Sequence, residues 1–200
     1  MRTAFCFDLD GTISSREILP AIASELGLAE EMTLLTSLTL RGLIPFESSF
    51  RLRCSILKQV PVSRVREIVA DIPLDPAIED FVRKNRERCA VVTGNLDVWV
   101  QDVLNRLECR AFTSCGTVAA DYLSSISSIL SKDAAVETFR DEKFERVVAI
   151  GDGFNDLPMF ETADIGVAYG GVHPPVPEIV QNADYVVCRG SSLCRLLNTL

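Results

Sequence analysis

The chain has 200 residues, of which 48% are hydrophobic and 24% are charged, and its formal net charge is −8 at pH 7. This composition is typical of a globular protein and excludes a disordered one. The negative charge argues against binding to nucleic acid or to an anionic membrane surface, because both require a basic patch. An anionic substrate would bind only where local cations or a metal ion outweigh the charge of the whole molecule.

Cysteine and histidine usage excludes several kinds of site. Seven cysteines are scattered without a Cys-x-x-Cys pair, and His173 is the only histidine. This pattern argues against structural zinc and against a Cys–His or Ser–His nucleophile. We expect His173 to be a loop residue rather than a ligand. The cysteines suit a reducing compartment. We expect no signal peptide, because Arg2 is followed almost directly by the first apolar run. No apolar run has transmembrane length. We therefore predict a cytoplasmic protein.

Short apolar runs alternate with helical patterns along most of the chain. Six runs predict strands, at residues 4–9, 89–93, 110–114, 147–151, 165–168 and 185–188. Five helices are predicted between them, at residues 76–88, 96–107, 132–142, 156–162 and 175–182. Runs such as "CAVVT" and "RVVAI" are apolar without alternation, which suits strands that are covered on both faces. The order of elements predicts an α/β fold with a doubly wound parallel sheet.

Residues 14–74 interrupt this order and contain no convincing strand. Plausible first helical residues and helix ends are the prolines and glycines Pro20, Pro45, Pro61, Gly27 and Gly42. We predict a small all-helical insert at 14–74, hinged near 13–14 and 72–76, in a core formed by residues 1–13 and 75–200. Ligands of open α/β sheets bind at the carboxyl ends of the strands. An insert that leaves the first strand there would cover the site as a cap.

Polar residues follow three of the predicted strands. Asp8 and Asp10 end the first strand, "TGN" (93–95) ends the second, and "GDGFND" (151–156) ends the fourth, while Lys132 opens the helix before that strand. Because these strand ends meet at one edge of the sheet, four carboxylates are expected to crowd together, namely Asp8, Asp10, Asp152 and Asp156. Such a cluster requires a cation or protonation. Its oxygen ligands suit Mg²⁺ together with a substrate phosphate.

Each of these motifs alone has an ordinary explanation. A lone Asp-x-Asp-Gly is usually a turn. A calcium loop starting at Asp8 fails, because Ile13 and Leu19 stand where Gly and Glu are needed. "GDGF" is no dinucleotide-binding fingerprint, since Asp156 takes the place of the third glycine, and it lacks the Lys-Ser/Thr of a phosphate loop. The four motifs in this order, each at a strand end or a helix start, favour a functional site over chance.

In this order, "DLDGT" (8–12), Thr93, Lys132 and "GDGFND" resemble the four motifs of the haloacid-dehalogenase superfamily of phosphatases. The resemblance covers essentially the whole chain. Within the superfamily it is to the phosphoserine-phosphatase-like branch, which has a helical cap after the first strand. It implies a Rossmann-like core with a C1-type cap, Mg²⁺ as the cofactor, and a small phosphorylated metabolite as the substrate.

The resemblance implies roles for the residues of these motifs. Asp8 would be the nucleophile that forms an aspartyl-phosphate, and Asp10 the general acid and then the base that activates water. Thr93 and loop N–H groups would hold phosphate oxygens, whose charge Lys132 would neutralise. The other residues implied at the phosphate or substrate are Thr12, Gly94 and Asn95.

The implied metal site uses the same carboxylates. Mg²⁺ would be held by Asp8, by the backbone carbonyl of Asp10 and by Asp152, with Asp156 in a supporting position. The ion would offset the repulsion between the two carboxylates that end the first strand.

The helix predicted to begin near Pro45 carries a stripe of Phe46, Phe50, Arg53 and Leu57, at spacings of four, three and four. Periodicity leaves open whether Arg53 is a snorkelling or salt-bridged side chain, or faces the cleft to bind a substrate carboxylate. The stretch resembles the cap helix of phosphoserine phosphatases, in which a Phe and an Arg seven residues apart meet the substrate. The resemblance implies that role for Phe46 and Arg53.

Glu17 lies seven residues after Asp10, which is the spacing of the substrate-amine-binding Glu in the resembled branch. Ser14 and Glu17 also match a helix capping box. Both roles of Glu17 stay open at this point, and the resemblance favours the contact with substrate.

The second motif departs from the family pattern, because Thr93-Gly94-Asn95 stands where Ser-Gly-Gly is usual. The Asn95 side chain would enter space where backbone normally contacts the substrate, which leaves the exact substrate open. We expect a phosphatase for phosphoserine or a related phosphorylated amino acid. The alternatives are a phosphatase for another small metabolite, a phosphotransferase that passes the phosphoryl group to an alcohol, and a non-catalytic phosphate-responsive binding module.

Overall fold

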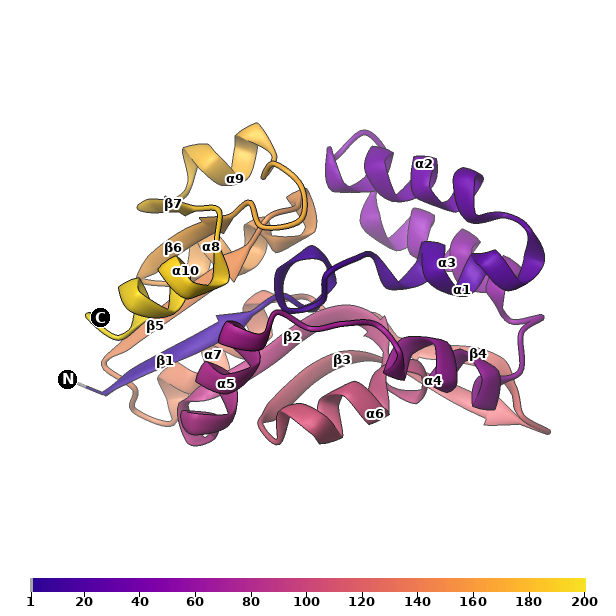
Figure 1. Ribbon diagram of the computed structural model, residues 1–200, viewed down its shortest axis with the longest axis horizontal. Helices are drawn as coiled ribbons and strands as arrows, with labels where there is room; N and C mark the ends of the chain where they lie inside the picture. The colour runs from indigo at the N-terminus through magenta and orange to yellow at the C-terminus, as the bar shows by residue number, and fades with distance from the viewer. Residues whose placement is uncertain (1) are drawn as a thin grey trace.

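Seven strands form a single sheet in the computed structural model, which describes residues 2–200 (Figure 1). The strands are β1 (Thr3–Phe7), β2 (Cys89–Leu96), β3 (Arg110–Ala119), β4 (Tyr122–Ser128), β5 (Arg146–Gly151), β6 (Ile165–Tyr169) and β7 (Tyr185–Val187). Their order across the sheet is β4-β3-β2-β1-β5-β6-β7, and every neighbouring pair is parallel except β3 and β4. The predicted α/β fold with a parallel sheet is confirmed.

Helices cover both faces of the sheet. They are α5 (Pro76–Lys84), α6 (Asp97–Leu107), α7 (Asp133–Asp141), α8 (Leu157–Thr162), α9 (Pro177–Gln181) and α10 (Gly190–Leu197). Phe5 and Phe7 of β1 pack with α5, α6 and α10, whereas Ala4 and Cys6 pack on the other face with α7, α8 and α9 (Figure 1). Successive strand side chains point to opposite faces, so a strand buried on both faces has no polar alternation.

Four helices lie between β1 and α5, namely α1 (Ile18–Ala23), α2 (Ala29–Leu40), α3 (Phe46–Leu57) and α4 (Val62–Ala70). Figure 1 shows α1, α2 and α3 together beyond the carboxyl end of β1. In contrast, α4 packs against α6, and Arg66 of α4 makes two hydrogen bonds with Asp102 of α6, at 2.9 and 2.6 Å. The segment is helical as predicted, and its separation from the core as a cap domain stays a prediction.

The predicted helix starts are wrong by one or two residues. Pro45 and Pro61 immediately precede α3 and α4, and Pro20 is the third residue of α1, so none is a first helical residue. The first-turn N–H groups of a helix have no intrahelical partner, so proline is tolerated at several positions there. Gly27 and Gly42 end helical segments as predicted, with φ of +67° and +68°.

Two elements were not predicted from the sequence, β4 and α10. β4 pairs with β3 as an antiparallel hairpin at the edge of the sheet, and most of its residues are exposed. Its serines weaken the hydrophobic pattern on which strand prediction depends. β2 and β3 also extend beyond their predicted ends, to Leu96 and Ala119, and α5 ends at Lys84 rather than at residue 88.

Among residues 2–200, no helix is both long and apolar enough to cross a membrane.

Candidate active site

β2, β1 and β5 are neighbours at the centre of the sheet, and this order brings the predicted motifs together. Asp8 directly follows β1, and its N–H donates to a backbone carbonyl of β5 at 2.9 Å. The chain then turns tightly, with the Ser14 N–H donating to the carbonyl of Leu9 at 2.8 Å. The Leu9 side chain is buried in the hydrophobic core, whereas Asp8 and Asp10 line the same cavity. The "DLD" spacing therefore separates one core residue from two site residues.

Three buried carboxylates and one lysine form the centre of the site. Carboxylate oxygens of Asp8, Asp152 and Asp156 lie within 4.8 Å of one another. Lys132, the residue before α7, donates from Nζ to Asp8 Oδ1 and, at 2.5 Å, to Asp156 Oδ1. Asp156 Oδ2 accepts the N–H groups of Asp152 and Gly153, each at 3.0 Å. Both oxygens of Asp156 are thus engaged in holding the lysine and the loop after β5.

Burial and mutual repulsion control the ionisation of this cluster. Desolvation raises the pKa of Asp8 well above its usual range, and the charge of Asp156 adds to this increase despite the nearby lysine. The same two causes raise the pKa of Asp152. Burial alone would lower the pKa of Lys132, but the charges of Asp156 and Asp8 raise it above its ordinary value. One buried lysine is too little positive charge for three buried carboxylates.

The residues present fit a divalent cation that takes oxygen ligands. Within residues 2–200, neither carboxylate oxygen of buried Asp152 accepts a hydrogen bond, although Oδ2 lies 3.0 Å from His173 Nδ1. A buried carboxylate without hydrogen-bond donors is unfavourable unless a cation or a proton compensates it. Asp152 and Asp8 supply the hard oxygen ligands that Mg²⁺ prefers.

Asp10 lies beside the cluster and accepts hydrogen bonds on both carboxylate oxygens. The Ile18 N–H donates to Oδ1 at 2.8 Å, Asn95 Nδ2 donates to Oδ2, and the Thr93 hydroxyl lies 3.5 Å from Oδ2. Asn95 also donates from its N–H and from Nδ2 to Thr93 Oγ1, each at 3.1 Å. Burial, followed by the charge of Glu17, raises the pKa of Asp10 to about 7. Such a pKa suits a group that gives and takes a proton near neutral pH.

A small cavity adjoins Asp8 and Asp10. The volume open to the centre of a water molecule is about 40 Å³. Its charged lining residues are Asp8, Asp10, Glu17 and Arg53. Phe46 of α3 packs on Gly94 of β2, where an added Cβ would lie 2.3 Å from the Cζ atom of the ring. Phe46, Gly94 and Asn95 line the cavity, whereas Thr12 is not among its lining residues.

Arg53 is buried in α3 and has no ion-pair partner in the part of the chain that the structure describes. Its residue is 4% exposed, and it donates to Thr36 Oγ1 at 3.0 Å and to the carbonyl of Ser49 at 3.4 Å. No carboxylate oxygen of residues 2–200 lies within 4.0 Å of its side-chain nitrogens. Burial lowers the pKa of Arg53, while the charge of Asp10 opposes this effect. Neither snorkelling nor a salt bridge describes this side chain, which leaves donors of a desolvated guanidinium for an anionic ligand.

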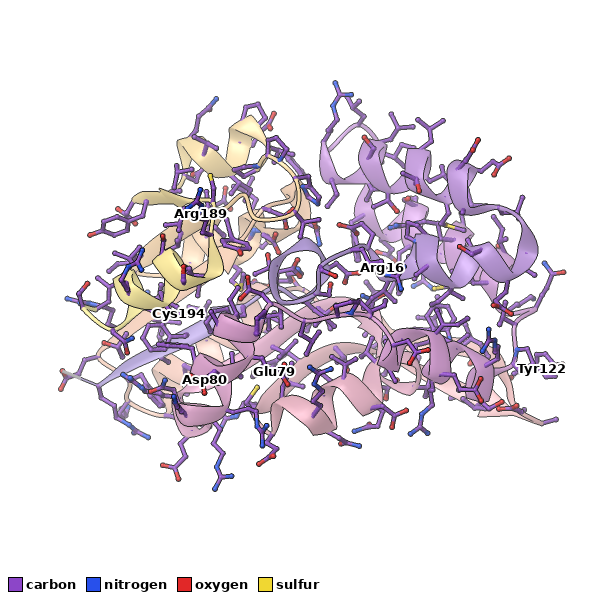
Figure 2. All side chains as sticks on the ribbon, in the orientation of Figure 1. Arg16, Glu79, Asp80, Tyr122, Arg189 and Cys194 are labelled. Atoms are coloured by element: carbon purple, nitrogen blue, oxygen red, sulfur yellow. The ribbon has the colours of Figure 1, made fainter. Side chains whose placement is uncertain are left out.

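The capping-box alternative for Glu17 is wrong. Ser14 Oγ donates to the carbonyls of Leu9 and Arg16, at 3.0 and 2.9 Å, and Glu17 precedes α1 without capping it. Arg16 itself is exposed where the chain passes from the core to α1 (Figure 2). Glu17 Oε1 instead accepts a hydrogen bond from His173 Nε2 at 3.1 Å, and this bond is the main cause that raises the pKa of His173.

Two polar residues of the site were not predicted as functional. Asn155 lines the cavity, and its Oδ1 is buried without a hydrogen-bond partner in residues 2–200. Asn155 belongs to the "GDGFND" motif, and this position in the motif is the signal by which the sequence could have indicated it. His173 lies in a loop after β6 as expected, yet its ring contacts both Glu17 and Asp152. The chain separation of 156 residues between His173 and Glu17 explains why no local pattern indicated this contact.

Known proteins resemble this chain over most of its length. The model of the haloacid dehalogenase-like hydrolase family matches residues 5–161. Phosphoserine phosphatase of Methanocaldococcus jannaschii is 31% identical over 178 residues, covering 82% of this chain and 83% of that protein. Phosphoserine phosphatase of Halobacterium salinarum is 28% identical and covers 98% and 97% of the two chains. A solved structure of a phospho-aspartyl intermediate analogue of phosphoserine phosphatase has a TM-score of 0.85 at 27% identity, over 100% of this chain and 98% of that one.

The family match spans well over half of the chain, so this protein belongs to the haloacid dehalogenase-like hydrolases. Within that family it is a phosphoserine-phosphatase-like protein and a phosphoric monoester hydrolase. The family resemblance inferred from the four sequence motifs is thereby confirmed.

Proposed function

We propose that the protein is a Mg²⁺-dependent phosphatase that hydrolyses phosphoserine, or a closely related phosphorylated amino acid, through an aspartyl-phosphate on Asp8. The observation that carries this proposal is the contact of Lys132 with Asp8, which lines a small cavity together with Asp10, two residues further along the chain. A nucleophile, a counter-charge and an acid–base group are the parts that phosphoryl transfer to a carboxylate needs.

In the first step a carboxylate oxygen of Asp8 attacks phosphorus. The new bond joins this oxygen to phosphorus, and the bond from phosphorus to the ester oxygen breaks. The electron pair of that bond stays on the leaving oxygen, which takes a proton from Asp10. Lys132 lies against Asp8 and is placed to neutralise charge that develops on the phosphoryl oxygens. The Thr93 hydroxyl and nearby backbone N–H groups would hold these oxygens.

In the second step water attacks the phosphorus of the aspartyl-phosphate. Asp10, now ionised, accepts the proton of that water. The bond between Asp8 and phosphorus breaks, which releases inorganic phosphate and regenerates both carboxyl groups. The hydrogen bonds from Ile18 and Asn95 to Asp10 support this alternation, because they fix the direction of its carboxylate.

Asp8, Asp152 and the backbone carbonyl of Asp10 would hold Mg²⁺, with Asp156 supporting the loop. When bound, the ion would supply positive charge beside the transferring phosphoryl group. Neither carboxylate oxygen of Asp152 accepts a hydrogen bond within residues 2–200, which supports this assignment.

The lining of the cavity supports an amino acid as the alcohol part of the substrate. Arg53 offers a buried guanidinium without a carboxylate partner, which suits a substrate carboxylate. Glu17 offers a carboxylate to a substrate amino group. The small volume of the cavity favours a small ester, and the names of the similar proteins point to phosphoserine.

The test is phosphate release by purified protein from a panel of phosphorylated metabolites, with Mg²⁺ and with EDTA. We expect the highest kcat/KM for phosphoserine, no turnover in EDTA, and recovery with added Mg²⁺. Asp8→Asn should lower kcat by about a thousandfold or more, because an amide cannot replace the attacking carboxylate. Near-normal turnover by Asp8→Asn would contradict the mechanism. Formation of a new phosphate ester from an added alcohol, in place of inorganic phosphate, would identify a phosphotransferase.

A further inference from the structure

We infer that His173 is a positioning residue that holds the Glu17 carboxylate at the wall of the cavity, and that it thereby selects substrates carrying an amino group. This inference rests on the proposed function, because it concerns how the same cavity recognises the alcohol part of its phosphate ester. It gives a role to the single histidine, which the proposed chemical steps do not use.

The His173 ring has a carboxylate at each of its nitrogens. Nε2 lies 3.1 Å from Glu17 Oε1, and Nδ1 lies 3.0 Å from Asp152 Oδ2. An ionised carboxylate can only accept hydrogen bonds, so the ring donates to Glu17. The contact joins the loop after β6 to the residue that precedes α1, and it is therefore a link between the core and the start of the helical insert.

Glu17 stands between His173 and the cavity. Glu17 lines the cavity, whereas His173 is not among its lining residues. Of the two carboxylate oxygens of Glu17, only Oε1 has a hydrogen-bond partner within residues 2–200. His173 thus fixes Oε1 of Glu17 by a hydrogen bond and leaves Oε2 for a ligand. In many sites, a residue that does not itself contact the ligand orients the group that does.

A glycine next to the histidine ring leaves the space that the ring occupies. Gly11 has φ of +69°, and an added Cβ would lie 2.8 Å from His173 Nε2, 3.2 Å from Glu17 Oε1 and 3.3 Å from Asp152 Oδ2. A side chain at position 11 would therefore displace the ring or the two carboxylates. The tight turn after Asp8 therefore leaves the space that the His173–Glu17 pair occupies.

The charges of the cavity favour an ammonium group at this wall. Three carboxylates and one guanidinium line the cavity, from Asp8, Asp10, Glu17 and Arg53. With Asp8 at phosphorus, Asp10 as the acid–base group and Arg53 matched to a substrate carboxylate, Glu17 is the remaining carboxylate of the lining for a cationic donor. A carboxylate that is already fixed by a hydrogen bond loses less side-chain entropy when it binds a ligand. This increases the discrimination between substrates with and without an amino group.

The test compares two substrates in wild-type protein and in four variants. The substrates are phosphoserine and 3-phosphooxypropanoate, which has hydrogen in place of the amino group. The variants are His173→Ala, His173→Gln, Glu17→Gln and the double variant Glu17→Gln/His173→Ala. We expect His173→Ala to lower the ratio of kcat/KM for phosphoserine to that for the analogue about tenfold, mainly through KM. His173→Gln retains a donor and should restore part of the ratio. In the Glu17→Gln background, removal of His173 should have little further effect on the ratio.

Exposed Val172 in the same loop supplies the matched control, because Val172→Ala should leave the ratio at the wild-type value. Thermal melts of every variant show that each is folded. If wild-type protein does not hydrolyse phosphoserine, the proposed substrate fails, and this inference fails with it. If wild-type protein hydrolyses phosphoserine but His173→Ala lowers kcat/KM equally for both substrates, or changes only the Mg²⁺ concentration for half-maximal rate, His173 acts through Asp152 and the inference alone is overturned.

Discussion

At the scale of single residues, the site contains buried polar side chains that lack the partners usual for their kind. Arg53 is the clearest case, because a buried guanidinium normally has a carboxylate partner and this one has two neutral acceptors, Thr36 and Ser49. Asn95 is a second case, because its amide group is used on Asp10 and Thr93 and not on the backbone of its own strand.

Replacement of Arg53 by Ala should separate substrate binding from chemistry. A charge-assisted contact contributes about 1.5–3 kcal/mol, so kcat/KM for phosphoserine should fall by roughly ten- to a hundredfold. Phosphoethanolamine, which has the amino group and lacks the carboxylate, should be affected far less. Steady-state kinetics on both substrates measures the difference. A purely structural arginine would instead lower both rates together with the melting temperature.

Replacement of Asn95 by Gly should affect both substrates alike. The change removes the amide donor to Asp10 Oδ2, a hydrogen bond to a charged group, and such bonds contribute about 1.5–3 kcal/mol. We expect kcat to fall at least about tenfold for phosphoserine and for phosphoethanolamine, since Asp10 would act in both half-reactions of the proposed mechanism. A selective effect on one substrate in kinetic assays would show that Asn95 contacts the alcohol part directly.

At the scale of elements, the return of the chain from the helical insert to the core depends on how α5 begins. Asp75 precedes the helix, its Oδ1 accepts the N–H groups of Ala77 and Ile78 at 2.9 and 3.1 Å, and Pro76 is the first helical residue. This is a strong N-terminal cap, because two otherwise unpaired donors share one carboxylate. The Asp75 cap lies inside the 72–76 segment, which the sequence predicts to be a hinge.

Asp75→Ala should lower the free energy of unfolding by about 1–2 kcal/mol, the usual loss on removal of such a cap. Urea denaturation monitored by circular dichroism measures the change. Asp71→Ala is the matched control, since Asp71 is exposed at the end of α4 and its side chain caps no helix. An equal loss in both variants would show that the Asp75 cap has no special contribution.

At the scale of the whole molecule, the buried acids should make stability depend on Mg²⁺ and on pH together. In metal-free protein, burial raises the pKa of Asp10 to about 7 and raises the pKa values of Asp8 and Asp152 in the same direction. In the unfolded chain an aspartate titrates near pH 4. The folded protein therefore binds more protons between about pH 4 and 7, so its stability falls as the pH rises through this range.

Added Mg²⁺ should reverse this loss, because under the proposed function it would bind the ionised carboxylates of the folded protein. At a hundredfold excess over its Kd the ion stabilises by about 2.7 kcal/mol, which corresponds to a rise in Tm of about 5–10 °C for a chain of this size. Thermal melts in EDTA and in Mg²⁺ at pH 5.5 and pH 8 measure the effect. We expect the larger shift at pH 8, and an equal shift at both pH values would argue against metal binding to these acids.

Local chemistry alone determined a large part of this protein. The apolar runs predict six of the seven strands, because strands covered on both faces need apolar side chains at every position. The "DLDGT" and "GDGFND" motifs lie where predicted, because each is a short stretch joined directly to a strand, and the spacing of Phe50, Arg53 and Leu57 places them on one buried face of α3. Serine-rich β4 was not predicted, because its pairing with β3 compensates for a weak pattern of its own.

Tertiary structure alone decided which of these groups meet. The packing of α7 against β1 and β5 brings Asp8 and Lys132 together across 124 residues of chain, and no local periodicity contains that arrangement. Packing also decided that Arg53 has no carboxylate partner within residues 2–200 and that Glu17 binds His173 rather than capping α1. Hydrogen bonds and charge depend on the distance between atoms and on burial, and both are properties of the folded chain that neighbouring residues in sequence do not specify.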